Sequence, residues 1–155
     1  MTFDAKVLTI SDSVAAGTRD DRSGELLAEL LGESGFHVVE RATVADGESN
    51  VAGALLRLSA NFRGLVVTTG GTGFSPTDQT PEGTSRVLER VAPGLSEAMR
   101  AVSPLGRLSR GVAGTVGETL IINLPGSPNG VRENFAAVSD VLAHVLDLMS
   151  GGTPH

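Results

Sequence analysis

Residues Gly64 to Glu82 have the sequence GLVVTTGGTGFSPTDQTPE, which is the strongest indication of the fold. A short apolar run at 65–67 leads into a glycine-rich turn. The turn leads through Asp78 to the sequence TPE at 80–82, which is typical of a helix start. A buried strand, a glycine turn, an acidic group and a helix N-terminus in this order favour an α/β protein that holds a phosphorylated ligand beside a metal ion.

The turn at 70–73 has the sequence GGTG, whose glycines can adopt positive φ and let backbone N–H groups approach an anion closely. Two familiar phosphate loops do not fit. A Walker A loop needs a lysine after its last glycine, and Lys6 is the only lysine in the chain; the dinucleotide fingerprint needs a third glycine where Pro76 stands. A tight connection without a ligand remains an open alternative. If the turn binds phosphate, it does so with backbone amides, threonine hydroxyls and a metal ion.

Composition narrows the function classes. The length of 155 residues predicts one domain spanning 1–155. The net charge of −6 and the absence of Tyr and Trp argue against a nucleic-acid-binding surface. The chain has no cysteine, which excludes disulfides and thiolate metal sites. No segment resembles a signal peptide or a membrane span, so we expect a cytoplasmic protein without a membrane partner.

The chain alternates strands and helices. In the first half we expect strand, helix, strand, helix and strand at 5–10, 23–34, 36–43, 51–61 and 65–69, with Ser23 as an N-cap. In the second half we expect helices at 81–91 (N-cap Thr80) and 94–101, strands at 110–116 and 119–124, and a last helix with apolar residues at helical spacing from Val131 to Met149. This order predicts an α/β fold with a mostly parallel sheet covered by helices.

Polar or glycine-rich loops follow each expected parallel strand. Because ligands bind outside the carboxyl ends of the strands in open α/β sheets, we expect these loops to converge. The candidate residues in them are Ser11, Asp12, Asp46, Gly70, Gly71, Thr72, Gly73, Asp78, Pro125, Gly126 and Ser127.

Three of these candidates are carboxylates: Asp12, Asp46 and Asp78. Alone they would repel a phosphate, but with Mg²⁺ between them they would hold it, since Mg²⁺ takes one or two carboxylates together with phosphate oxygens. Such a site would align a nucleophile with a nucleoside triphosphate. The alternative, that Asp12 and Asp46 only make turns or cap helices, stays open because Asp is favoured at both positions.

Several motifs in order resemble the MogA/MoaB family of molybdenum cofactor biosynthesis, over essentially the whole chain. They are TISD (9–12), TTGGTG (68–73), DQTPE (78–82), PGLSEAMR (93–100), LSR (108–110) and LPGSP (124–128). The chain is also similar to the corresponding domain of gephyrin and of plant molybdenum-cofactor proteins.

The resemblance implies a three-layer α/β/α sandwich that assembles as a homotrimer, with a molybdate-insertion protein as a further partner. The implied reaction is the transfer of AMP from ATP to the terminal phosphate of molybdopterin, with Mg²⁺, giving adenylyl-molybdopterin and pyrophosphate. Residues matching the family's motifs are Asp46 and Asp78 as catalytic and metal-binding acids, Gly70–Gly73 and Pro125–Ser127 as ligand turns, and Ser109 on the pterin side.

Some assignments stay open at this stage. Glu82 would bind the metal or only place a favourable charge in the first helical turn. Arg107 and Arg110 would contact a phosphate or lie solvated on the surface. Two other functions also remain: a MoaB-type molybdopterin-binding protein without adenylyl transfer, and a scaffolding trimer like that of gephyrin.

Overall fold

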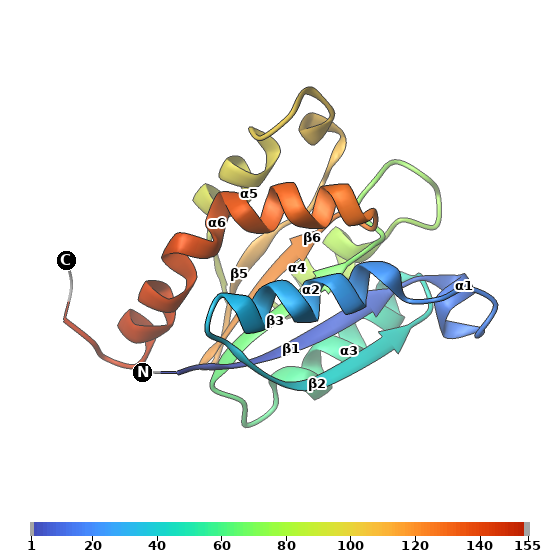
Figure 1. Ribbon diagram of the computed structural model, residues 1–155. Helices are drawn as coiled ribbons and strands as arrows, with labels where there is room; N and C mark the ends of the chain where they lie inside the picture. Colours follow the sequence, from blue (N-terminus) through green and yellow to red (C-terminus); the bar gives the residue numbers. More distant parts are fainter. Residues whose placement is uncertain (1, 154–155) are drawn as a thin grey trace.

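A six-stranded sheet forms the middle of the computed structural model, which describes residues 2–153 (Figure 1). Its strands are β1 (Asp4–Ile10), β2 (His37–Val44), β3 (Gly64–Thr69), β4 (Arg90–Val91), β5 (Ala113–Val116) and β6 (Thr119–Leu124). The order across the sheet is β2-β1-β3-β6-β5-β4. The first four strands in this order are parallel, and β5 and β4 close one edge with antiparallel pairing. The mostly parallel sheet predicted from the sequence is confirmed.

Helices cover both faces of the sheet. They are α1 (Asp12–Ala15), α2 (Arg22–Glu33), α3 (Glu48–Ser59), α4 (Thr80–Val87), α5 (Pro93–Arg100), the 3₁₀ helix η1 (Pro104–Leu108) and α6 (Pro128–Met149). Apolar residues of α2, α5 and α6 pack with Val7 and Val67 on one face, whereas those of α3 pack with Leu8 and Val66 on the other. Successive residues of a strand thus point into two separate cores, because side chains alternate between the two faces of a sheet. The three-layer arrangement is confirmed.

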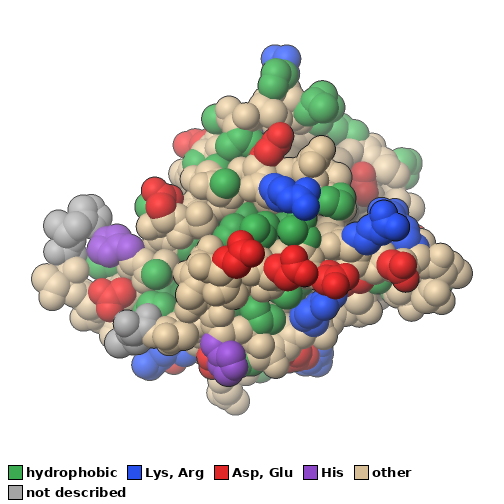
Figure 2. Space-filling model, in the orientation of Figure 1, with side chains coloured by type: hydrophobic (Ala, Val, Ile, Leu, Met, Phe, Trp, Pro, Cys, Tyr) green, Lys and Arg blue, Asp and Glu red, His purple; other side chains and the backbone are tan. Residues whose placement is uncertain are grey.

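The face that carries α2 and α6 has charges of both signs. Figure 2 shows acidic side chains gathered over α2, whose sequence supplies Glu25, Glu29 and Glu33, with basic side chains close by. Between residues 2 and 153, no helix combines the length and the apolar character that a membrane span requires.

Several expected element boundaries were wrong, each for a local reason. Asp21 rather than Ser23 caps α2, since its carboxylate accepts the N–H of Gly24 at 3.0 Å. Thr80 lies inside α4 and Gln79 is the N-cap. That helix also ends at Val87 instead of continuing to Val91, because 90–91 pair with β5.

The strand expected at 110–116 starts only at Ala113. Arg110 is drawn away from the sheet, because its backbone N–H donates to the carbonyl oxygen of Thr72 at 2.8 Å. The 3₁₀ helix η1 was not anticipated at all.

Candidate active site

The loops after the four parallel strands converge at the carboxyl edge of the sheet, as expected. They are tied to one another by backbone hydrogen bonds: the N–H of Ser11 donates to Val44 at 3.0 Å and that of Gly70 to Leu124 at 3.1 Å. The Thr69 hydroxyl donates to the carbonyl oxygen of Pro125 at 2.7 Å. These bonds fix the loop after β1 to the end of β2, and the loop after β3 to the end of β6 and the loop that follows it.

Two cavities open at this edge. The first has a volume of about 690 Å³ and is lined by residues of all four loops. Arg19, which follows α1, and Arg22, at the start of α2, also line it. The second has about 650 Å³ and is walled by η1, by the glycine turn and by the start of α6. The wall shared by both consists of Gly71, Asp78, Gly126 and Ser127. Asp78 is the only ionisable group among the four.

Most of the residues expected from the sequence line one of these cavities. Ser11, Asp46 and Gly70 line the first; Thr72, Gly73, Ser109 and Pro125 line the second; Gly71, Asp78, Gly126 and Ser127 line both. Asp12 and Glu82 line neither cavity; the Asp12 carboxylate accepts the N–H of Asp46, and the Glu82 carboxylate is paired with Arg110.

The backbone conformation of the glycine turn at 70–73 depends on glycine φ angles and on close contacts with neighbouring residues. Gly70 and Gly71 adopt φ of 104° and 68°, a region that favours glycine. The Thr80 side chain fastens the turn by donating to the carbonyl oxygen of Gly70 at 2.9 Å. Gly73 does not adopt such a φ; a Cβ there would lie 2.9 Å from a carboxylate oxygen of Asp78. A Cβ at Gly73 would therefore displace the Asp78 carboxylate, so this glycine leaves room for that side chain and is not required by its φ.

Donors suited to an anion face this edge. Across residues 2–153, no backbone carbonyl accepts the N–H groups of 71–73. Beside them lies the N-terminus of the long helix α6, capped by Ser127, whose hydroxyl accepts the N–H of Gly130 at 3.0 Å. Free N–H groups and the positive end of a helix dipole favour phosphate.

Asp46 is held by a reciprocal pair of bonds with Asp12. The N–H of Asp12 donates to the Asp46 carboxylate at 3.1 Å, and the N–H of Asp46 donates to the Asp12 carboxylate at 3.0 Å. Burial raises the pKa of Asp46 above its usual value, and the nearby charges of Asp12 and Asp78 raise it further, against the opposing effect of the Asp12 N–H. Asp12 therefore orients Asp46.

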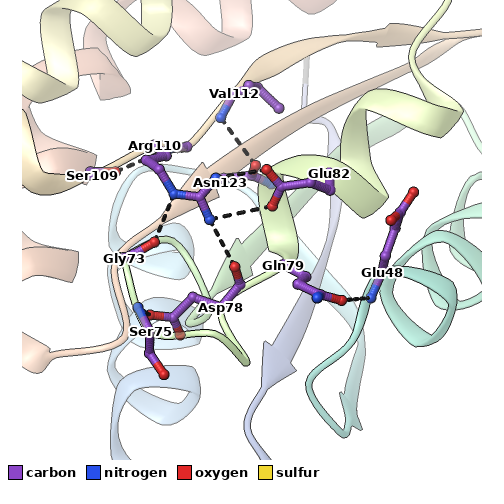
Figure 3. Close-up of polar contacts among 11 residues, drawn as sticks. Glu48, Gly73, Ser75, Asp78, Gln79, Glu82, Ser109, Arg110, Val112 and Asn123 are labelled. Carbon is purple, nitrogen blue, oxygen red and sulfur yellow. Dashed lines mark hydrogen bonds and ion pairs between the residues drawn. The ribbon is translucent and has the colours of Figure 1, made fainter.

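Asp78 ends the exposed loop that follows Gly73 (Figure 3). Its carboxylate accepts the N–H of Ser75 at 3.0 Å, and its own N–H donates to the carbonyl oxygen of Ser75 at 2.9 Å. The next residue, Gln79, accepts the N–H of Glu48 at 2.9 Å. That bond ties the Asp78 segment to the start of α3, two residues after Asp46.

Arg110 and Glu82 form an ion pair at 2.6 Å beside this loop (Figure 3). The hydrogen bond from Arg110 is the largest cause that lowers the pKa of Glu82 below its usual value. The same guanidinium donates to the carbonyl oxygens of Gly73 and Asp78, each at 2.7 Å. Arg110 is thus neither a solvated surface residue nor open to a phosphate.

Comparison with known proteins identifies the family to which this chain belongs. Residues 6–144 match the family described as "Probable molybdopterin binding domain". The chain belongs to this family. The membership expected from the motifs is therefore confirmed, and the match includes Asp46, Asp78 and both ligand turns.

Individual relatives of this molybdopterin-binding domain are close over its whole length. The molybdopterin adenylyltransferase of Helicobacter pylori (strain J99) is 38% identical over 157 residues, covering 97% of this chain and 89% of its own. The structure of the molybdopterin biosynthesis enzyme MoaB from Thermus thermophilus superimposes with a TM-score of 0.89 at 42% identity, covering 96% and 97% of the two chains. The Drosophila melanogaster protein cinnamon is 38% identical, but this chain spans only 25% of its length.

The described residues of this molybdopterin-binding domain supply too few ligands to hold a divalent cation alone. Oxygen atoms of a bound substrate would have to complete its coordination. The His, Asp and Glu residues between 2 and 153 form no group of three or more that could hold a metal ion. Asp46 and Asp78 both line the first cavity, however, and their charges interact. Two carboxylates suit Mg²⁺ when phosphate oxygens and water complete its shell.

Several lining residues were not identified from the sequence. Arg19 and Arg22 belong to a stretch read only as a polar loop, although arginines beside an acidic strand end are a usable signal for a polyphosphate. Leu105 and Leu108 of η1 line the second cavity and are 73% and 54% exposed. Leucines this exposed around a cavity indicate a ligand with apolar surface.

Proposed function

We propose that this chain is a molybdopterin adenylyltransferase that takes ATP in the first cavity and molybdopterin in the second. The observation that carries the proposal is the shared wall: two cavities of similar volume meet at Asp78, between two glycine turns. A reaction that joins two substrates needs such a junction, because holding the reacting atoms together replaces a bimolecular encounter. The relatives named molybdopterin adenylyltransferase support the same reaction.

The proposed step is an attack of a terminal phosphate oxygen of molybdopterin on the α-phosphorus of ATP. The new P–O bond forms as the bond from the α-phosphorus to the bridging oxygen breaks, and pyrophosphate leaves with that electron pair. An ionised phosphate needs no general base. The free N–H groups of 71–73 and the α6 N-terminus would stabilise charge on the phosphoryl oxygens.

Asp46 and Asp78 are the residues that would hold Mg²⁺ against the triphosphate. When bound, the cation would neutralise charge that builds on the phosphate oxygens. Arg19 and Arg22 would face the β- and γ-phosphates from the opposite wall. Ser109 and Asn134 would supply hydrogen bonds to the pterin, with Leu105 and Leu108 against its ring.

Assembly and location are part of the proposal. A homotrimer in the cytoplasm is what the family resemblance implies, and Val91, 68% exposed on the edge strand β4, provides apolar surface for such an assembly. A molybdate-insertion protein would then be the next partner of the product. Sedimentation equilibrium tests the trimer: a monomer mass at micromolar concentration contradicts it.

The deciding experiment measures pyrophosphate release by the purified protein with ATP, Mg²⁺ and molybdopterin. We expect release that depends on molybdopterin, together with adenylyl-molybdopterin as product. The similarity to MoaB proteins favours one alternative, a protein that binds molybdopterin without transfer. Tight molybdopterin binding without pyrophosphate release would establish that alternative and overturn the proposed reaction.

A further inference from the structure

Arg110 fastens the Asp78 loop at both ends. Its Nε donates to the carbonyl oxygen of Gly73 and its Nη2 to that of Asp78, each at 2.7 Å. Its backbone N–H donates to Thr72 just before the loop. These contacts join the segment between η1 and β5 to a loop that lies 32 to 37 residues earlier in the chain. Arg110 therefore bridges the start and the end of the loop (Figure 3). The backbone N–H of Thr80, which donates to the carbonyl oxygen of Gly71 at 3.0 Å, closes the loop at its base.

The guanidinium has little capacity left for a substrate. Besides the two carbonyls, it donates to both carboxylate oxygens of Glu82, at 2.6 and 3.3 Å, which occupies all but one of its N–H groups. The Phe74 ring lies 5.8 Å from its central carbon. Glu82, the counter-ion, is in turn held in α4. The bonding pattern is that of a structural fork, and a phosphate-binding arginine would keep its fork open.

The loop has few other restraints. Phe74 is 71% exposed, and 74–77 belong to no helix or strand. The Asp78 carboxylate is held by the Ser75 N–H, a donor within the same loop. If the loop shifts, that bond shifts with it, so it cannot fix the carboxylate relative to the cavities. Two restraints come from outside the loop: the bond from the Glu48 N–H to Gln79, just after Asp78, and the Arg110 fork, which alone reaches both Gly73 and Asp78.

We propose that Arg110, with Glu82 as its counter-ion, is a positioning residue that fixes the Asp78 carboxylate at the junction of the two cavities. This inference rests on the proposed adenylyl transfer for its kinetic consequence. Arg110 does not touch the reacting atoms; it acts through the backbone of Gly73 and Asp78. A displacement of about 1 Å at a reacting group can cost about 100-fold in rate, so a loosened loop should reduce turnover far more than binding.

The kinetic test compares R110M and R110K with R63M. Arg63 forms a similar exposed ion pair with Glu118 at 2.6 Å and lines neither cavity, so R63M is the matched control. We expect R110M to lower kcat about 30- to 100-fold, with KM for each substrate within about threefold of wild type. R110K should have a kcat close to that of R110M, because a lysine ammonium group cannot form the forked pair of hydrogen bonds. Added guanidinium ion should partly rescue R110A.

A second measurement does not depend on catalysis. Amide hydrogen exchange should accelerate in R110M at Ser75 and Asp78, whose N–H groups close the loop, while the amides of β1 and β3 keep their protection. Wild-type kcat in R110M, or faster exchange throughout the sheet, would overturn the inference. If the wild-type protein releases no pyrophosphate, the proposed reaction fails, and the exchange rates alone decide whether Arg110 fixes the loop.

Glu82 provides a second variant, E82Q, whose kcat and Mg²⁺ dependence can be measured whether or not R110M folds. We expect E82Q to lower kcat by about threefold to tenfold, and the double variant R110M/E82Q to be no worse than R110M, because the two residues act as one unit. The apparent Mg²⁺ constant of E82Q should match that of wild type. A raised Mg²⁺ constant, with effects of E82Q and R110M that multiply, would make Glu82 a metal ligand and contradict its role as counter-ion.

Discussion

The two cavities have nearly the same volume but very different walls. The first carries charges of both signs, because Arg19 and Arg22 line it together with Asp46. The second is lined by Leu105 and Leu108 together with hydrogen-bonding groups such as Ser109, and its two charged lining residues, Asp78 and Glu133, are both acidic. Because the volumes match and the walls differ, the protein would distinguish its two substrates by their chemistry and not by their size. It would take a polyphosphate on one side and a flat, mostly uncharged ring system on the other.

The largest effect is expected at Asp78, which belongs to both cavities. Because D78N removes the charge at the junction while keeping the shape of the side chain, turnover should fall about 100- to 1,000-fold, the range typical for loss of one electrostatic contact at a reacting centre. Molybdopterin binding, followed by pterin fluorescence, should be nearly unchanged. D140N, on the exposed surface of α6, is the control. Normal turnover in D78N would remove Asp78 from the mechanism.

The charged cavity is tested by the double variant R19A/R22A. Each contact between an arginine and a phosphate contributes about 1.5–3 kcal/mol when formed, so KM for ATP should rise about 30-fold or more. Molybdopterin affinity should stay the same if the cavities are separate. R132A, an exposed arginine on α6 that lines neither cavity, controls for net charge. An equal loss for both substrates would break the division between the cavities.

For the apolar cavity we expect the opposite result: weaker molybdopterin binding with unchanged ATP binding. Truncating two leucines in L105A/L108A should weaken molybdopterin binding about tenfold, because the apolar contact area of both side chains is lost. KM for ATP should not change, and neither should thermal stability, since both leucines are exposed. L56A removes an equally exposed leucine from α3 and should alter neither affinity. Weakened ATP binding in L105A/L108A would mean that the nucleotide occupies this cavity.

The smallest effect concerns stability. The pKa of Asp46 is raised above its usual value of 3.8, mainly by burial, so the folded protein binds this proton more tightly than the unfolded chain does. The ionised carboxylate therefore destabilises the fold at neutral pH. D46N should therefore raise Tm slightly at pH 7 relative to wild type.

The pH dependence of that gain has a definite sign. The stabilisation by D46N should be complete above the folded pKa and should disappear as the pH falls below 3.8, where wild type is protonated in both states. Differential scanning calorimetry from pH 3 to 8 measures it, with D140N as the control. A gain that grows toward low pH would contradict the raised pKa.

The residues at the carboxyl ends of the parallel strands could be predicted from the sequence, because each strand is recognisable from its own residues. Asp46 and Asp78 follow strands that can be recognised from their own residues, and parallel strands bring their carboxyl ends together whatever the details of packing. Gly71 was correctly expected to have positive φ. The same reasoning failed for Gly73, whose requirement for space comes from the approach of Asp78 and not from the turn itself.

Tertiary contacts explain what could not be predicted. The partners of Arg110 lie 28 to 38 residues away, and no pattern around LSR indicates that its fork closes on a loop. The wall formed by η1 was missed because a 3₁₀ helix of five residues has no apolar period to detect. Asp12 looked like an independent ligand, yet its carboxylate accepts the Asp46 N–H.

Part of the partition between the two cavities consists of backbone alone. A Cβ placed on Gly126 would lie only 3.2 Å from the Cα of Gly70, so the turns after β6 and β3 touch with no side chain between them. Charge brought to one side is then felt on the other well within the screening length of about 8 Å in physiological salt. Thermodynamic reciprocity follows: whatever factor ATP imposes on molybdopterin affinity, molybdopterin imposes on ATP. Titrating each ligand in the presence of the other measures that factor, and the thin partition makes it differ from one.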